Sequence, residues 1–435
     1  MKIGIIGLGF VGLTLTSFLG SKGHKIIAID SDESKLKKIS NGKIPFYEQG
    51  LEKLLKKSLK HNISFSLDVN DAVNNCKIIF VTVGTPQKKN GKIDLTMIKS
   101  VFQQIGKNLK NVRNDPVIVI KSTILPETTQ KMIRILEQKS KKKNGKDFGV
   151  INNPEFLQET QAVRDTQKPH IIVIGGKKDK FFSRLKNLYK KLHPKIPIIE
   201  TNSQTSELIK YANNSFLATK ISFINQIASI CESIPNANVD DVAKSIGLDP
   251  RIGSLFLNAG PGYGGSCLPK DVKALINFSK NLGIEPKLLQ AVENVNLNQI
   301  RGVISNIKKE LGKISKKKIT ILGLAFKPNT DDIRDSIAIK LIKYLLKEDA
   351  LIRVHDPKAL ENTKKIFKEK IEYFNSIKDA LKKSECVIIV TPWNEYKLLS
   401  ENDFKTMRKK VVIDTRRILK NIQNINYHPL GIGVG

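Results

Sequence analysis

The sequence has neither a CxxC pair nor a histidine-rich segment. Its four cysteines are scattered over the chain at Cys76, Cys231, Cys267 and Cys386. This spacing argues against a disulfide framework and against a structural zinc site, and it is typical of proteins in a reducing cytosol. We therefore expect no metal site and a cytoplasmic location.

Long apolar segments are also absent, apart from one run at the N-terminus. Lys2 is followed by an apolar stretch from Ile3 to Gly20 that imitates a secretory signal. This stretch is interrupted by glycines and has no evident small-residue cleavage site. A buried strand followed by a glycine turn explains it better than a signal peptide or a membrane span. We predict no membrane insertion anywhere in the chain.

Acidic residues are scarce, since 41 Asp and Glu stand against 74 Lys and Arg, for a formal net charge of +33. Nucleic-acid binding is one interpretation, but no aromatic-rich or basic recognition motif supports it. The lysines are spread over nearly every segment, and the densest runs, Lys139–Lys146 and Lys313–Lys318, lie between apolar segments. We interpret the charge as a solvated lysine-rich surface without a nucleic-acid partner, whose field would favour an anionic substrate.

The length of 435 residues is enough for two or three hydrophobic cores. In residues 1–200, short apolar runs alternate with amphipathic stretches, which is the pattern of βαβ units around a parallel sheet. The runs that we expect to form strands are Ile3–Ile6, Lys25–Ile29, Ile78–Val83, Val117–Ile120, Val150–Asn152 and Ile171–Ile174.

From residue 201 the pattern becomes helical. A stretch with almost no Gly or Pro reaches Cys231, and its apolar residues cover more than one face. Such a helix is typically buried, so we expect it between domains or subunits. The βαβ pattern returns after residue 312, where ITILGLAF (319–326) resembles IGIIGLGF (3–10).

Two further segments repeat the first domain, since 352–357 resembles 26–30 and 387–392 resembles 79–86. We therefore predict an α/β protein with two doubly wound Rossmann-like domains joined by a long central helix and a helical core. The expected domains are 1–200 for a dinucleotide cofactor, 201–312 as the helical region, and 313–435 for a second nucleotide.

A glycine motif, Gly7-Leu8-Gly9-Phe10-Val11-Gly12, directly follows the first expected strand. Gly7 permits the tight turn, Gly9 lets the backbone approach a pyrophosphate, and Gly12 lets helix and strand pack closely. Asp30 ends the next strand at the spacing expected for a carboxylate on a ribose 2′-hydroxyl. Because that carboxylate would repel a 2′-phosphate, the sequence favours NAD over NADP.

A second glycine-rich segment runs from Gly260 to Asp271 and contains Cys267. Pro269 and the apolar run behind it predict that a helix begins near Ser266, which puts Cys267 at a helix N-terminus. There the helix dipole and Lys270 favour a reactive thiolate. The other three cysteines have apolar surroundings and are expected to be buried and inert.

Two more groups of polar residues lie in otherwise apolar segments. Lys210 and Asn214 are spaced i, i+4 on the central helix, so both project from one face and need partners or a task. Glu155 and Glu159 follow a strand, where α/β enzymes place catalytic loops. From the sequence alone, Glu159 could act with Glu155 or be an ordinary acid at a helix N-terminus.

Together these motifs resemble the UDP-glucose/GDP-mannose dehydrogenase family from Met1 to about Arg417. The shared segments are GLGFVG, Ser122-Thr123 with Pro126, NPEFL, SELIKYANNSFLATKISFINQ, Asp249-Pro-Arg251-Ile-Gly, GPGYGGSCLPKD and AFKPNTDDIRDS. The resemblance implies an NAD-dependent oxidation of a nucleotide sugar in polysaccharide biosynthesis. It also implies that residues 201–312 form a homodimer or a higher homo-oligomer.

The resemblance also assigns residues to each ligand. NAD would be held by Gly7, Gly9, Phe10, Val11, Gly12, Asp30, Lys35, Thr85, Thr123, Glu159, Lys270 and Arg334. The nucleotide sugar would be bound by Glu155, Phe156, Leu157, Glu159, Lys210, Asn214, Arg251, Phe256, Leu257, Asn258, Ala259, Gly260, Gly264, Lys327 and Arg416. Arg251 would reach the substrate of the neighbouring subunit.

The implied reaction oxidises the C6 alcohol to a carboxylate in two hydride transfers. Cys267 would trap the aldehyde as a thiohemiacetal, and the thioester formed from it would be hydrolysed. The catalytic set would be Cys267, Lys210, Asn214, Glu155, Asp271 and Thr123. The motifs leave open how Glu155, Lys210 and Asp271 divide the roles of base.

UDP-glucose, as in the UDP-glucose 6-dehydrogenase branch, is the substrate that the resemblance favours; GDP-mannose and UDP-N-acetylhexosamines are the alternatives. Gln158-Glu159-Thr160 stands where UDP-glucose enzymes often have Arg-Glu-Gly, and Lys168-Pro169-His170 replaces an Asn-Pro-Asp-Arg segment. A two-electron dehydrogenase with a Rossmann domain and a helical core is a rival interpretation. It would not need a thiol at Cys267.

Overall fold

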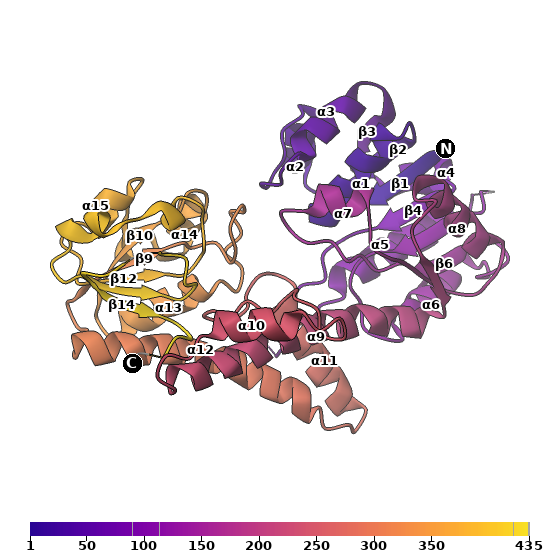
Figure 1. Cartoon of the computed structure of the whole chain (residues 1–435). Helices are drawn as coiled ribbons and strands as arrows, with labels where there is room; N and C mark the ends of the chain where they lie inside the picture. Colours follow the sequence, from indigo (N-terminus) through magenta and orange to yellow (C-terminus); the bar gives the residue numbers. More distant parts are fainter. Residues whose placement is uncertain (89, 113, 421, 434–435) are drawn as a thin grey trace. The chain divides into compact units, whose positions relative to one another are not determined.

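The computed structural model describes residues 1–88, 90–112, 114–420 and 422–433. The chain divides into two compact units, Met1–Asn213 and Asn214–Gly435, each with its own sheet (Figure 1). The chain passes from one unit to the other within the long helix α9 (Ser203–Glu232).

The first unit is built on an eight-stranded sheet with the order β3-β2-β1-β4-β5-β6-β7-β8. Its central strands are runs of buried Ile, Val and Phe, as a parallel sheet covered on both faces requires. The strands are β1 (Lys2–Ile6), β2 (Lys25–Ile29), β3 (Ile63–Ser66), β4 (Ile78–Val81), β5 (Val117–Ile120), β6 (Gly149–Asn152), β7 (Ile172–Gly175) and β8 (Ile198–Thr201).

Helices cover both faces of this sheet. One buried cluster packs α1 (Phe10–Ser21), α3 (Leu51–Asn62) and α8 (Lys180–Leu192) against the sheet. The other packs α4 (Val69–Asn75), α5 (Thr96–Leu109) and α6 (Thr128–Ser140). The short helices α2 (Glu33–Ser40) and α7 (Ala162–Gln167) complete the unit. This doubly wound arrangement confirms the predicted fold of the first unit.

The expected strands are confirmed within two residues, but one direction is not as predicted. β6 and β7 meet antiparallel, so β7 and β8 run opposite to the other strands. The expectation of a wholly parallel sheet is therefore wrong at Ile171–Ile174. The two strands are paired only at Asn152 and Gly175. With a single paired position there is no run of ladder hydrogen bonds that would favour a parallel direction for β7.

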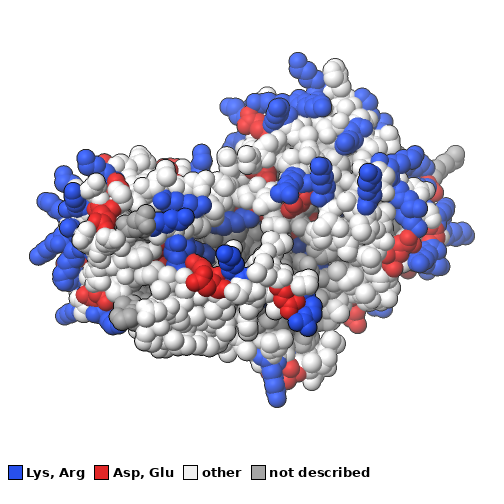
Figure 2. Space-filling model, viewed as in Figure 1, with Lys and Arg blue, Asp and Glu red and all other residues white. Residues whose placement is uncertain are grey.

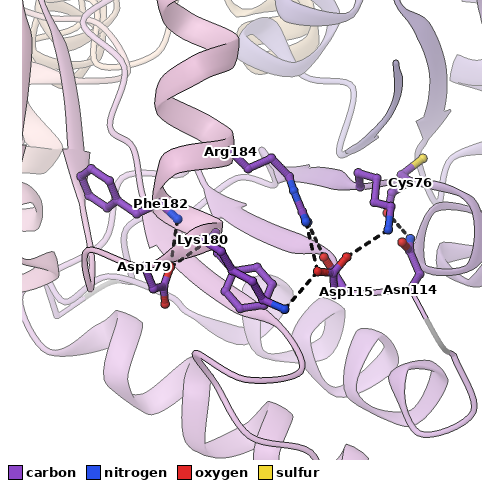
Figure 3. A network of polar contacts seen from close by, with 9 residues as sticks. Cys76, Asn114, Asp115, Asp179, Lys180, Phe182 and Arg184 are labelled. Carbon is purple, nitrogen blue, oxygen red and sulfur yellow. Dashed lines mark hydrogen bonds and ion pairs between the residues drawn. The ribbon is translucent and has the colours of Figure 1, made fainter.

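A polar network lies at the N-terminal end of β5, away from the carboxyl ends of the strands (Figure 3). The Asp115 carboxylate contacts Lys77 at 3.0 Å, Lys180 at 3.2 Å and Arg184 at 3.0 Å. Although burial opposes it, these three cations hold the pKa of Asp115 well below its usual range. Because Lys180 and Arg184 belong to α8, the network fastens that helix to the base of the sheet.

The second unit begins with helices and ends with a six-stranded parallel sheet of order β11-β10-β9-β12-β13-β14. Its first helices after α9 are α10 (Val239–Gly247), α11 (Leu268–Asn281) and α12 (Lys287–Leu311). The strands are β9 (Lys318–Leu322), β10 (Leu351–His355), β11 (Glu372–Tyr373), β12 (Cys386–Ile389), β13 (Val411–Asp414) and β14 (Asn426–Pro429).

Helices α13 (Ile337–Lys347), α14 (Leu360–Phe367) and α15 (Ile377–Leu381) accompany this sheet, with short 3₁₀ segments at Lys368–Lys370, Tyr396–Leu398 and Glu401–Thr406. One buried cluster joins α12 and α13 to β9, β10, β12 and β13. The second Rossmann-like domain that the repeat of ITILGLAF predicted is thus confirmed.

Within the described residues, no helix combines the length and apolarity that a bilayer span requires. On the face drawn in Figure 2, Lys and Arg side chains are scattered among uncharged atoms and outnumber Asp and Glu.

Candidate functional site

The glycine turn between β1 and α1 has the geometry of a phosphate-binding loop. Gly7 has a φ of 97°, and a Cβ on Gly12 would lie 1.9 Å from the Gly7 carbonyl oxygen. A Cβ on Gly9, in contrast, would meet nothing within 4 Å. Helix α1 begins at Phe10, so its free N–H groups face this open space. The residues fit a dinucleotide pyrophosphate.

Asp30 lies at the end of β2 and points back to the glycine turn. Its Oδ2 accepts hydrogen bonds from the Leu8 N–H and from Lys35 Nζ, both at 2.7 Å, and its Oδ1 accepts one from the Asp32 N–H at 3.1 Å. The carboxylate is thus fixed beside the turn, where the ribose of a dinucleotide would lie. Through this ion pair Lys35, which was also predicted to hold the cofactor, lies next to Asp30.

The loops after β4 and β5 are tied to each other. Thr85 Oγ1 donates a hydrogen bond of 2.7 Å to the Thr123 carbonyl, and Ser122 Oγ donates one of 2.6 Å to the Val83 carbonyl. Both loops follow the carboxyl ends of adjacent parallel strands. The structure therefore brings Thr85 and Thr123 to the same edge of the sheet as the glycine turn.

Glu155 and Lys210 form an almost fully buried ion pair. Lys210 Nζ is 3.2 Å from Glu155 Oε1, and the side chains are only 5% and 9% exposed. The Leu157 N–H donates to Glu155 Oε2 at 2.6 Å, and the Lys210 ammonium lies over the Phe156 ring, 5.4 Å from its centroid. This pairing supplies the partner that the sequence required for Lys210.

The electrostatics of this pair favour an ionised carboxylate. Burial raises the pKa of Glu155, but the charge of Lys210, the Leu157 N–H and the charge of Lys121 together bring it below its ordinary value. An ionised, poorly hydrated carboxylate beside an ammonium can act as a base or stabilise a developing charge.

Glu159 follows in a loop that Glu48 holds. The buried Glu48 carboxylate accepts hydrogen bonds from the Thr160 N–H at 2.7 Å and from the Ala162 N–H at 2.8 Å. Thr160 has a φ of 71°, which costs about 1 kcal/mol for a β-branched residue. Glu159 precedes α7 and is outside its first turn. Sequence reasoning missed Glu48, because its partners are more than a hundred residues away.

In the second unit, Cys267 is the exposed N-cap residue of α11, as predicted. Ser266 Oγ lies 3.5 Å from its sulfur. Cys76, Cys231 and Cys386 are buried, also as predicted, and burial raises the pKa of Cys76 to about 12. Cys267 is thus the exposed thiol among the four, at a helix end that favours a thiolate.

A buried carboxylate lies one turn further along α11. Asp271 is 1% exposed, and its oxygens accept hydrogen bonds from Lys270 Nζ at 2.5 Å and from Asn214 Nδ2 at 2.7 Å. Asp271 therefore fixes the amide of Asn214, the second of the two polar residues that the sequence singled out on the central helix.

The glycine-rich segment before Cys267 is fastened by two buried asparagines. Asn225 Oδ1 accepts from the Gly260 N–H at 2.8 Å, and Asn296 bonds both the N–H and the carbonyl of Tyr263. A Cβ on Gly264 would lie 2.5 Å from the Asp335 carbonyl oxygen. Glycine is needed there because two backbone segments touch.

Arg416 lies against the same segment, since a Cβ on Gly260 would be 2.4 Å from its Nη1. Its Nε donates to the Val390 carbonyl at 2.9 Å. Burial, together with the charge of Arg417, lowers the pKa of Arg416 to about 10. The structure thus joins Gly260 and Arg416, which the resemblance placed together in the substrate set.

The remaining predicted residues of this unit lie in surface loops or pack beneath them. Arg251 is bound to Asp249, and Arg334 to Asp332. The Lys327 ammonium lies 5.5 Å from the centroid of the Phe326 ring. In the loop at 256–260, Phe256 has a φ of 66°, Leu257 and Ala259 are buried, and Asn258 is exposed.

Comparisons with known proteins identify the family of each part of the chain. The chain matches the models of the UDP-glucose/GDP-mannose dehydrogenase family for the NAD binding domain over residues 1–193, the central domain over 204–298 and the UDP binding domain over 320–421.

Individual relatives match over nearly the whole chain. It is 39% identical to the UDP-glucose 6-dehydrogenase TuaD of Bacillus subtilis, covering 99% of this chain and 93% of the relative. It is 40% identical to a UDP-glucose 6-dehydrogenase of Rickettsia felis, covering 100% and 96%. The solved UDP-glucose dehydrogenase of Pyrobaculum islandicum superposes with a TM-score of 0.93 at 33% identity, covering 99% of this chain and 98% of that one.

Proposed function

The chain belongs to the UDP-glucose/GDP-mannose dehydrogenase family, and on that premise we propose that it oxidises UDP-glucose to UDP-glucuronate through a thioester on Cys267. It is an NAD-dependent nucleotide-sugar 6-dehydrogenase. The observation that carries the covalent mechanism is the exposed Cys267 at the start of α11. Asp271, which accepts hydrogen bonds from Lys270 and Asn214, follows one turn later.

The proposal assigns one ligand to each sheet. Residues 1–200 bind NAD through the open face of Gly9, the free N–H groups of α1 and the Asp30 carboxylate. Residues 313–435 bind the uridine diphosphate, with Lys327 and Arg416 as cations for it. Residues 256–264 bind the sugar, and Arg334, Lys270, Thr85, Thr123 and Glu159 complete the cofactor set.

NAD⁺, when bound, accepts a hydride from C6 of the sugar in each of the two oxidations. In the first, the C6 hydroxyl proton passes to Glu155 as the carbonyl forms. The Cys267 thiolate then adds to C6, and the carbonyl electron pair becomes an oxyanion. The Lys210 ammonium and the Asn214 amide stabilise this oxyanion. Loss of the second hydride from C6 restores the carbonyl as a thioester.

Hydrolysis releases the product. Before this step Glu155 releases the proton of the first oxidation to solvent. Glu155 then takes a proton from water, the water oxygen adds to the thioester carbonyl, and the C–S bond breaks to return the Cys267 thiolate; the proton of the new carboxyl group passes to solvent and leaves the uronate. We assign the base to Glu155 because its carboxylate is held ionised. Asp271 is engaged by both Lys270 and Asn214, so we give it the task of orienting Asn214.

The test is to supply UDP-glucose, GDP-mannose and UDP-N-acetylhexosamines in turn with excess NAD⁺, and to measure NADH and product per sugar. We expect two NADH and one UDP-glucuronate per UDP-glucose. A yield of one NADH with an aldehyde product would refute the four-electron reaction. Faster turnover of GDP-mannose or of an N-acetylhexosamine would refute only the choice of sugar.

We also propose that residues 201–312 form a homodimer. Phe216, Phe223 and Ile230 recur every seven residues on α9 and are 66%, 52% and 48% exposed. A helix that shows such a stripe to water usually covers it with a partner. The exposed Arg251 would then reach the neighbouring subunit. A monomeric mass by light scattering at micromolar concentration would refute this, and Phe216→Glu is expected to split the dimer.

The proposed setting is the cytoplasm, with the uronate consumed in polysaccharide biosynthesis. The four free thiols accord with a reducing compartment.

A further inference from the structure

Lys121 is a buried cation that the proposed mechanism does not use. It follows β5 directly and precedes Ser122. Its Nζ donates to Asn153 Oδ1 at 3.1 Å and to the Asn153 carbonyl at 3.4 Å. Lys121 and Glu155 line the same apolar pocket of the first unit, so the ammonium and the proposed base share one poorly hydrated space.

Asn153 anchors the loop that carries Glu155 through hydrogen bonds to the surrounding elements. Its N–H donates to the Ile120 carbonyl at 2.9 Å, and its Nδ2 donates to the Val173 carbonyl at 2.7 Å. Its Oδ1 accepts from Lys121 and, at 2.5 Å, from Tyr189 Oη. The first residue of the loop is therefore held from β5, β7 and α8, and only Lys121 among these contacts brings a charge.

The charged surroundings of Glu155 are correspondingly simple. Lys210 contacts it from α9, and Lys121 acts on it from the end of β5. The other titratable groups around the pocket are Asp165 and His170, from the segment after the loop, Tyr189 of α8, and His193, which follows the last residue of α8. Helix α1 contributes only the apolar side chains Val11, Leu15, Phe18 and Leu19.

We propose that Lys121 is a positioning residue for Glu155, which anchors the loop through Asn153 and supplies the second positive charge that keeps the buried carboxylate ionised. The proposal rests on the assignment of Glu155 as the base in thioester hydrolysis. Two cations against one buried carboxylate leave a net positive charge, which also favours the oxyanion.

The titration of Lys121 is consistent with this placement. Burial lowers its pKa to about 8; the charge of Lys210 acts in the same direction and that of Glu155 opposes it. Lys121 is therefore charged below about pH 8, over the range in which Glu155 must stay deprotonated. Burial lowers the pKa of His193, and the charges of Lys22 and Lys121 add to this, so a neutral imidazole is favoured in the lining of the pocket.

The experiment compares the pH dependence of kcat for uronate formation in wild type, Lys121→Met and Lys121→Arg. Without the second charge, the pKa of Glu155 rises, so we expect the acid limb for Lys121→Met to move up by about one pH unit. The KM values for sugar and NAD⁺ should stay within about twofold, since the charge acts on the base and not on binding. Lys121→Arg should restore the wild-type limb.

Two control variants separate charge from packing. Tyr189→Phe removes the other donor to Asn153 Oδ1 without changing the charge, and we expect a lower Tm with an unmoved acid limb. Lys99→Met removes a charge from the exposed face of α5 and should move neither. If Lys121→Met is too unstable to assay, Lys121→Gln, with its shorter polar side chain, provides the same comparison.

An acid limb that stays in place in Lys121→Met or Lys121→Gln would overturn the proposal, as would an equal displacement in Tyr189→Phe. Failure of the proposed function is recognised separately. If wild type forms no uronate, or if Glu155→Gln retains full thioester hydrolysis, the base assignment is wrong and the Lys121 proposal falls with it. If both tests pass and the limb stays in place, only the role of Lys121 is refuted.

Discussion

The two Rossmann-like sheets begin with nearly the same turn and use it differently. Gly7 and Gly323 have φ values of 97° and 92°. The N–H of each glycine donates a hydrogen bond to the carbonyl of the last residue of the next strand, which is Ile29 in the first unit and His355 in the second. In each unit a carboxylate at the end of the second strand accepts from the residue after the glycine, Leu8 or Leu324. The local scaffold is thus repeated in detail.

The segments after the two turns differ. In the first unit α1 begins at Phe10, and Gly9 leaves open space in front of its N–H groups. In the second unit Ala325 replaces that glycine, and α13 begins only at Ile337. The intervening loop instead packs on the glycine-rich segment before Cys267, where the Gly265 N–H donates to the Arg334 carbonyl at 3.1 Å.

The carboxylates of Asp30 and Asp356, which end the second strands of the two sheets, also differ in their number of hydrogen-bond donors. Asp30 accepts from two N–H groups and one ammonium. Asp356 is 2% exposed and accepts from the N–H groups of Leu324, Ala325, Lys358 and Ala359 and from the indole of Trp393. With its hydrogen bonds filled in this way, Asp356 holds three loops together, whereas the hydrogen bonds of Asp30 come from the glycine turn and the start of α2. One scaffold can therefore serve as a ligand site or as a brace, depending on a few residues after the turn.

The largest expected effect tests whether the second unit supplies a catalytic nucleophile in addition to a nucleotide-binding sheet. We expect Cys267→Ser to lower uronate formation by about 10⁴-fold or more, since a hydroxyl at that position is a far weaker nucleophile than a thiolate. The affinity for the nucleotide sugar, measured by calorimetry, should change little. Wild-type rates of acid formation in this variant would rule out the covalent role.

Gly9→Val tests the open face of the first turn. A Cβ at position 9 has no other protein atom within 4 Å, so the valine side chain causes no clash at this atom and the Tm should be preserved. The same side chain would fill the space assigned to the pyrophosphate, and we expect NAD⁺ affinity to fall about 100-fold. Gly302→Val on α12, where a Cβ also meets nothing, is the control for adding a side chain in open space. Unchanged NAD⁺ binding in Gly9→Val would contradict the assignment.

The pair Asp30→Asn and Asp356→Asn compares the two carboxylates directly. Asp356→Asn puts an NH₂ group among N–H donors in a buried site, and we expect a loss of about 2–4 kcal/mol in unfolding free energy. Asp30→Asn should cost less and should weaken discrimination against NADP, because the charge that repels a 2′-phosphate is gone. Denaturant unfolding and the ratio of NAD to NADP turnover measure the two effects. Equal destabilisation with unchanged cofactor preference would show that both carboxylates are braces.

The sequence predicted correctly those strands, turns and helix ends that are determined by residues close together in the chain. Apolar runs located the central strands, but β3 and β8 were missed because these edge strands are only half-buried and contain polar residues. The glycine turns, Asp30 and Cys267 could be found because backbone geometry or a helix end restricts those residue types.

Lys121 and Glu48 could not be found in this way, since their roles depend on partners 32 and more than a hundred residues away. For the same reason, the sequence could not show that Glu155 pairs with Lys210, which lies 55 residues further along the chain.

The smallest expected effect extends the comparison to a buried carboxylate with fewer donors than Asp356. Glu207 on α9 is 1% exposed, and its Oε1 accepts from the N–H and the hydroxyl of Thr129 at the start of α6. Burial raises the pKa of Glu207 from 4.5 to about 7, against the effect of these two bonds. The folded chain therefore binds this proton more tightly than the unfolded chain does.

It follows that stability should fall as the pH rises from about 4.5 to about 7 and should lose no more from this group above pH 7. Glu207→Gln removes the titration, so we expect it to raise unfolding free energy by about 1–2 kcal/mol at pH 8 relative to wild type, with little change at pH 5. Glu361→Gln, an exposed carboxylate of the second unit, is the control. A gain for Glu207→Gln that is the same at pH 5 and pH 8 would show that the Thr129 bonds, and not the buried charge, determine its contribution.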